Sequence, residues 1–226
     1  DLMTPEGMER FVEFANNVNL GYLLVSGGGE PMMERKSILK IIEKVDSERI
    51  VLVTSAHWAK TRDAATRYLL DIKNALSKRS SETTLTIRVS VDSEHTATLT
   101  LDPIINLINL FYEEYSKVPQ LELQIHSLEG DFAIDELIKL LEHNFVISRK
   151  KVGEQRISDG KNALKIVPSQ ELITFNDMQI KVGFAKTFYS NLRVNVHDHK
   201  VLQRNIDVYQ KDLFERTGAS GLTIIG

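Results

Sequence analysis

The sequence predicts an α/β protein in which parallel strands alternate with helices. Residues 20–25 and 50–53 are apolar throughout, and such uninterrupted runs are typical of strands buried on both faces of a parallel sheet. A segment with helical periodicity follows each strand, and this alternation continues up to residue 143. A doubly wound sheet and a barrel both explain the alternation. Polar residues at each strand end, which suit one shared ligand, favour the barrel.

Each predicted element has a local reason in the sequence. Thr4 and Pro5 open a first helix, because a hydroxyl suits the N-cap and proline suits the first helical position. Apolar residues then recur on one side of each helix, whereas the strands are short apolar runs. After the opening helix, which reaches residue 17, the predicted strands are 20–25, 50–53, 85–92 and 121–125, and the helices that follow them are 31–45, 60–78, 102–115 and 134–143.

The pattern changes after residue 143. Short β-like runs follow, and Asn176-Asp177 between two of them suits a hairpin turn. We therefore expect a barrel core in residues 1–143, and in residues 144–226 the last barrel strand or strands with a β-rich and helical extension. The β-like runs are 145–148, 163–167, 171–175 and 178–184, of which the last begins a candidate sixth strand, and residues 202–216 form a predicted helix.

Composition excludes several classes of function. The chain has 226 residues, of which 42% are hydrophobic and 26% charged, as in an ordinary soluble domain. A net charge of -3 and a pI near 6.1 argue against a generally basic nucleic-acid-binding surface. We find no signal peptide and no run near the roughly 18 apolar residues of a membrane span. We therefore expect a cytoplasmic protein without a membrane or nucleic-acid partner.

The loop after strand 20–25 carries the most specific motif. Gly27, Gly28 and Gly29 allow positive φ angles or a close approach to a ligand, although a plain tight turn would also explain them. Glu30 adds a carboxylate that suits an ammonium group, and Pro31 suits the first turn of the next helix. Residues 28–31 resemble the GGEP motif of radical S-adenosylmethionine (radical SAM) enzymes, in which this loop holds the amino group of the cofactor's methionine moiety.

Strand 85–92 carries the second motif. A period of two places Arg88, Ser90 and Asp92 on one face of this strand. The segment resembles the one that contributes to cofactor ribose and carboxylate contacts in the same family. The resemblance implies that Ser90 or Asp92 accepts hydrogen bonds from the ribose hydroxyls and that Arg88 pairs with the methionine carboxylate. The structural alternative is an ion pair between Arg88 and Asp92.

Two further strand ends add weaker candidates. Ser55 lies where the family often carries a TNG-like segment, although the following Ala56-His57 departs from that pattern. His126 ends strand 121–125, where the resemblance implies a place near the adenine or the substrate; a purely structural histidine is the alternative. His197-Asp198-His199 could place two imidazoles on one face, but it lacks further matched ligands, so a solvated segment is favoured over a metal site.

Family membership over residues 4–143 would imply a partial (βα)6 TIM-like barrel with its helices outside. Radical SAM enzymes hold a 4Fe–4S cluster through a CxxxCxxC loop, and cluster irons need thiolates, yet this sequence contains no cysteine. The resemblance therefore places the first strand and the cluster loop upstream of Asp1. Without them, we expect the chain to be inactive and its sheet to have one open edge.

The activity implied by the resemblance is reductive cleavage of S-adenosylmethionine to a 5'-deoxyadenosyl radical, which abstracts hydrogen from an unidentified substrate. Its cofactors would be S-adenosylmethionine and the cluster, with flavodoxin or ferredoxin as electron donor. Two alternatives stay open, namely a degenerate barrel that only binds its ligand and an unrelated α/β enzyme that binds a phosphate or sugar. The joint presence of Glu30, Arg88 and Asp92 favours the enzyme, because a structural relic has little need of all three.

Overall fold

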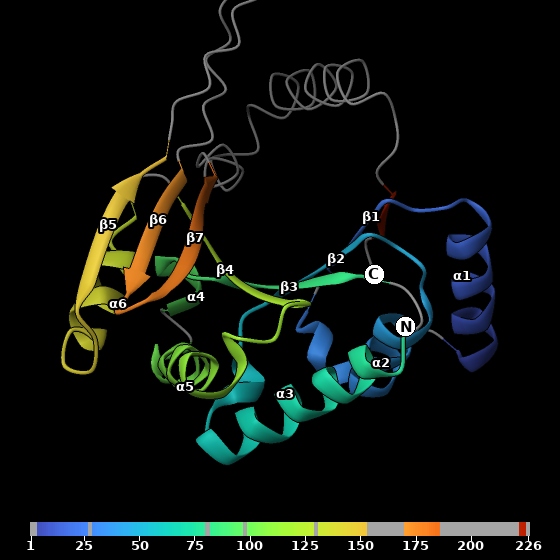
Figure 1. Ribbon diagram of the computed structural model, residues 1–226, viewed down its shortest axis with the longest axis horizontal. Helices are drawn as coiled ribbons and strands as arrows, with labels where there is room; N and C mark the ends of the chain where they lie inside the picture. The colour runs from blue at the N-terminus through green and yellow to red at the C-terminus, as the bar shows by residue number, and fades with distance from the viewer. Residues whose placement is uncertain are drawn as a thin grey trace, which may run out of the picture.

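The computed structural model describes residues 4–26, 29–79, 82–96, 99–128, 131–152, 170–185 and 222–224. They form a mixed, mostly parallel sheet in the order β5-β6-β7-β4-β3-β2-β1-β8, with helices packed against it (Figure 1). The predicted α/β fold with parallel strands is therefore confirmed. In this described part of the chain, no helix is both long enough and apolar enough to cross a membrane.

Four neighbouring strands of the sheet, β1 to β4, follow one another in chain order. Its strands are β1 Tyr22–Val25, β2 Arg49–Thr54, β3 Thr84–Ser90, β4 Leu121–Leu128, β5 Ile147–Lys151, β6 Gln170–Phe175, β7 Met178–Ala185 and β8 Leu222–Ile224. From β1 to β4 each strand pairs in parallel with the next, and β7 then pairs in parallel with β4. A doubly wound sheet reverses its strand order part-way, and no such reversal occurs between β1 and β4.

The helices begin largely where the sequence predicts. Thr4 Oγ1 accepts a hydrogen bond from Gly7 N at 3.1 Å, and Thr61 Oγ1 accepts one from Ala64 N at 3.2 Å, so both threonines are N-caps. The α-helices are α1 Pro5–Asn17, α2 Arg35–Lys44, α3 Arg62–Ser77, α4 Ser93–Thr96, α5 Asp102–Leu110 and α6 Ala133–Leu141. Shorter turns are the 3-10 helices η1 Pro31–Glu34 and η2 His57–Ala59 and the π-helical η3 Phe111–Tyr115.

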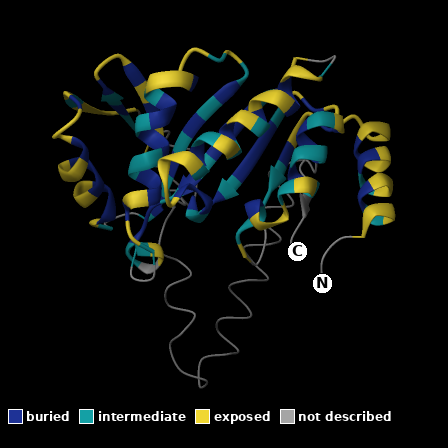
Figure 2. Ribbon diagram, turned by 90° about the horizontal axis from the view of Figure 1, so that it is seen from below, coloured by how far each residue is buried: buried dark blue, intermediate teal, exposed yellow. Residues whose placement is uncertain are grey.

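The two faces of the sheet differ in polarity. Helices α2, α3 and α5 lie together on one face, and Figure 2 shows their exposed outer sides in front of the buried strands. Along β4, Leu123 and Ile125 are buried, whereas Gln124 and His126 between them are only half-buried. The apolar residues therefore face the helices, and the polar residues face the opposite side. We call that side the open face; in Figure 1 the sheet curves around it.

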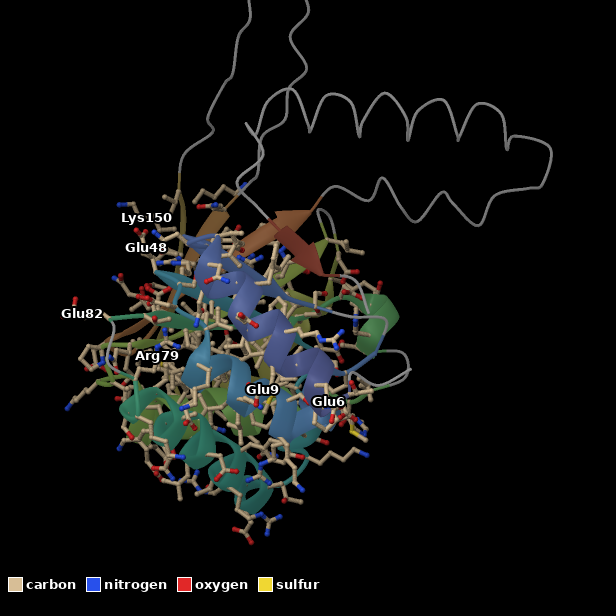
Figure 3. All side chains as sticks on the ribbon, turned by 90° about the vertical axis from the view of Figure 1, so that its right-hand side faces the viewer. Glu6, Glu9, Glu48, Arg79, Glu82 and Lys150 are labelled. Atoms are coloured by element: carbon tan, nitrogen blue, oxygen red, sulfur yellow. The ribbon has the colours of Figure 1, made fainter. Side chains whose placement is uncertain are left out.

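The parallel strands all begin at the same end of the sheet, and their carboxyl ends lie together at the opposite end, which we call the carboxyl edge. Figure 3 shows Glu48 and Glu82, which precede β2 and β3, on the same side of the molecule.

The predicted hairpin is confirmed, because β6 and β7 pair in antiparallel fashion around Asn176, whose φ is 55°. The predicted strand 163–167 and helix 202–216 lie outside the described residues. The expected open edge does not lie at β1, because β8 pairs with β1 there in parallel, and β8 is the last strand of the sheet on that side.

Candidate functional site

The glycine loop leaves β1 at the carboxyl edge of the sheet. Gly28 lies outside the described residues, and Gly29 is exposed. A Cβ added to Gly29 would meet no described atom within 4 Å, so none of the described residues crowds the loop there. Pro31 begins η1, as its fixed φ favours, and Glu30 caps this short helix by accepting a hydrogen bond from Met32 N at 3.1 Å. The end of the loop is therefore held by its own carboxylate.

Glu30 also joins this loop to the end of the neighbouring strand. Its Oε1 accepts a hydrogen bond from Thr54 Oγ1 at 2.7 Å, and its Oε2 accepts from Ser55 N at 2.8 Å and Ser55 Oγ at 2.6 Å. Thr54 Oγ1 accepts in turn from Trp58 Nε1 at 2.9 Å. With the bond from Met32 N, four donors surround a carboxylate that has about four acceptor positions. Glu30 thus fixes the loop to β2, and Ser55 belongs to the same cluster.

The end of β3 separates the three residues that were predicted to share a face. Arg88 and Ser90 are half-buried on the open face, as expected. Asp92 lies two residues beyond the strand, where the alternation no longer applies, and is only 7% exposed. Its carboxylate accepts a hydrogen bond from His95 N at 2.9 Å and contacts His95 Nδ1 at 2.7 Å. Asp92 therefore caps α4, and the side chain that contacts its carboxylate is His95 rather than Arg88.

His126 lies beside Ser90, because the β3–β4 register pairs these two residues. Burial, followed by the positive charge of Arg88, lowers the pKa of His126 below its ordinary value of 6.5, and the negative charge of Asp92 opposes this only partly. The imidazole is therefore neutral at neutral pH. On its other side lies Gly183, which leaves the space beside the ring free of a side chain.

A second carboxylate joins the loops after β3 and β4. Asp131 Oδ2 accepts hydrogen bonds from Ser93 N at 2.9 Å and Ser93 Oγ at 2.7 Å, and Oδ1 accepts from Ala133 N at 2.8 Å. Burial by itself would raise the pKa of Asp131, but these hydrogen bonds outweigh it and lower the pKa. Sequence reasoning missed this residue. Its position just before α6 was the available signal, because Asp is common near helix N-termini.

The rim at the carboxyl ends of β1–β4 is thus held by two carboxylates. Glu30 joins the β1 loop to β2, and Asp131 joins the loops that follow β3 and β4. Between them, Arg88, Ser90 and His126 present a guanidinium, a hydroxyl and a neutral imidazole on the open face. Such a set can bind a ligand that combines a carboxylate with sugar hydroxyls.

Two polar side chains near the rim, Ser127 and His57, have buried atoms without a hydrogen-bond partner among the described residues. Ser127 is 1% exposed and faces the helices, and its Oγ has no hydrogen-bond partner among the described residues. His57 Nδ1 is likewise buried without a hydrogen-bond partner among the described residues. Neither atom takes part in the hydrogen bonds of the rim. His197-Asp198-His199 lies outside the described residues. Within those residues, no group of three His, Asp or Glu side chains is placed to hold a metal ion.

Comparison with known proteins identifies no family. No protein-family model matches the chain, and no curated protein matches it.

Proposed function

We propose that this chain is the barrel core of a radical SAM enzyme and that it binds S-adenosylmethionine across the carboxyl ends of β1–β4. The observation that carries the proposal is the end of the glycine loop, where Glu30 is hydrogen-bonded to β2 at the same rim as Arg88, Ser90 and His126. Ligands of barrel proteins bind at this end of the strands. In the proposed partial (βα)6 barrel, β1 to β4 and then β7 are the second to sixth strands.

Each end of the cofactor has a suitable partner at the rim. The loop carbonyls would accept hydrogen bonds from the methionine ammonium, because four donors of the chain already occupy the Glu30 carboxylate. The negative charge of Glu30 would still attract the ammonium. Arg88 would pair with the methionine carboxylate, and Ser90 and the neutral His126 would contact the ribose and adenine.

The iron–sulfur cluster does not fit the residues of this chain. A 4Fe–4S cluster needs thiolate ligands, and the 226 residues contain none. Reductive cleavage of S-adenosylmethionine would therefore require cluster ligands and an electron donor that these residues do not supply. We expect the chain alone to bind the cofactor without cleaving it.

Isothermal titration calorimetry with S-adenosylmethionine tests the proposed binding. We expect Arg88→Gln to weaken binding by about ten- to a hundredfold, because a hydrogen bond between charged groups contributes about 1.5 to 3 kcal/mol. Arg49→Gln is the matched control, since Arg49 begins β2 at the other end of the sheet. An equal loss in both variants, or no binding to the unaltered chain, would contradict the proposal. Binding of ribose 5-phosphate instead would support an unrelated α/β enzyme.

The missing cysteines favour one second candidate, a barrel that binds S-adenosylmethionine without radical chemistry. Anaerobic reconstitution with iron and sulfide, carried out on the protein in its natural length, distinguishes the radical SAM enzyme from the non-catalytic barrel. Cluster absorbance together with release of 5'-deoxyadenosine would establish the enzyme. Cofactor binding without either signal would establish the non-catalytic barrel.

A further inference from the structure

A cavity of about 380 Å³ lies between the amino-terminal halves of β4 and β7, nearer to the amino ends of the strands than the rim. The register explains it, because the β4–β7 ladder begins only at the pair Gln124–Lys181. Before that pair the two strands are not hydrogen-bonded to each other, and Leu123 of β4 and Met178 of β7 line the opening. Phe111 of η3 contributes to the same wall. The volume lies within the range of about 300 to 1,000 Å³ that is usual for small-molecule sites.

The charges around this cavity favour an anion. Lys181 of β7 and Lys117 of the segment after η3 line it, and among the described residues neither lysine has an ion-pair partner. Two carboxylates also line the cavity. Glu122 already accepts a hydrogen bond from Thr86 at 3.2 Å and lies 3.7 Å from Arg49, which leaves Asp177 as the single carboxylate set against two ammonium groups. The uncompensated charge is positive.

Amide side chains connect the cavity with the rim. Gln124 lines the cavity, and its Oε1 accepts a weak hydrogen bond from Arg88 at 3.5 Å. His126 is two residues further along β4, or about 7 Å closer to the carboxyl edge. Gln179 adds a second amide from β7. A molecule in the cavity would therefore have hydrogen-bonding groups beside it, and its upper end would lie just below the rim.

We infer that this cavity binds a small molecule through a carboxylate or phosphate group held by Lys181 and Lys117. The assignment of that molecule as the substrate rests on the proposed function, because it places the far end of the ligand beneath the proposed cofactor. Gln124 and Gln179 would bind its polar atoms, and Leu172 would contact its apolar part. The substrate class is thus a small, polar organic acid or phosphate ester.

Calorimetry with two probes, inorganic phosphate and succinate, tests the site at constant ionic strength. We expect at least one probe to bind, Lys181→Gln to weaken its binding by about tenfold, and Lys181→Arg to retain it, because a cation is what the site needs. Lys150→Gln is the matched control. Lys150, labelled in Figure 3, lies level with Lys181 through the β5–β6–β7 register but does not line the cavity.

Each outcome decides the inference. Binding of phosphate alone indicates a phosphate ester, and binding of succinate alone indicates a carboxylic acid. Equal losses in Lys181→Gln and Lys150→Gln would show general charge attraction and overturn the site, as would no binding of either probe. Parallel titrations with S-adenosylmethionine distinguish this result from a failure of the proposed function, because Lys181→Gln should leave cofactor binding unchanged while Arg88→Gln weakens it.

Discussion

The carboxylate of Glu30 should contribute strongly to stability as well as to the shape of the rim. Glu30→Gln keeps the size of the side chain but replaces one oxygen with an NH2 group. One oxygen accepts from Met32 N and Thr54 Oγ1, and the other accepts from Ser55 N and Ser55 Oγ. Whichever way the new amide turns, its NH2 group would face two of these donors.

The cost follows from those contacts. In either orientation one backbone N–H loses its acceptor. The Ser55 hydroxyl can rotate and accept a hydrogen bond from the amide, whereas Thr54 Oγ1 already accepts from Ala56 N and Trp58 Nε1. Hydrogen bonds to a charged acceptor contribute about 1.5 to 3 kcal/mol. We therefore expect Glu30→Gln to lower the free energy of unfolding by about 2 to 3 kcal/mol. Urea denaturation followed by circular dichroism measures this as a lower midpoint with an unchanged slope.

Glu34→Gln is the control for that experiment. Glu34 lies in the same short helix, is exposed, and makes no side-chain capping bond at the start of α2. Its substitution should change the free energy of unfolding by less than about 0.5 kcal/mol. If the two variants were equally stable, Glu30 would not hold the loop, and the reasoning about the rim would be wrong.

Three further predictions follow from the rim. Because the pKa of His126 is lowered in the folded protein, this histidine is protonated at a higher pH in the unfolded chain than in the folded one. The free energy of unfolding should therefore fall as the pH drops below about 6.5. His126→Gln should remove that part of the pH dependence, as measured by urea denaturation at several pH values. Because the pKa of Asp131 is lowered, this carboxylate stabilises the fold fully above its ordinary pKa of 3.8, and the stabilisation is lost as the pH falls through the lowered pKa. Asp131→Asn should therefore lower the free energy of unfolding by about 1 to 2 kcal/mol at neutral pH. A difference that persisted unchanged at pH 2 would contradict this. Thr54→Val removes the acceptor of Trp58 Nε1 and one donor to Glu30, so it should lower the free energy of unfolding by about 1 to 3 kcal/mol and alter the tryptophan fluorescence, whereas an unchanged emission spectrum would argue against the contact.

Much of the fold could be predicted because its signals are local. Apolar runs such as residues 50–53 mark parallel strands, and threonine caps such as Thr4 mark where helices begin. The common location of Glu30, Ser55, Arg88, Ser90 and His126 followed from one rule, namely that the carboxyl ends of parallel strands meet at one edge.

The remaining features depend on contacts between distant residues. Whether Asp92 faces a ligand or caps a helix depends on where β3 ends, and strand ends are poorly determined by alternation alone. The pairing of β8 with β1 joins residues about 200 positions apart, for which a sequence of three residues gives no signal. The cavity beside Lys181 arises because β4 and β7 separate, a property of neither strand alone.

Two-dimensional 1H–15N NMR spectra recorded with and without S-adenosylmethionine test the central claim most directly. The account predicts that shift changes concentrate at the rim, in the amides of Gly29, Ser55, Ser90 and His126, while the amides at the amino ends of β2 and β3 stay unchanged. Shift changes confined to those amino ends, or none at a saturating concentration, would contradict it.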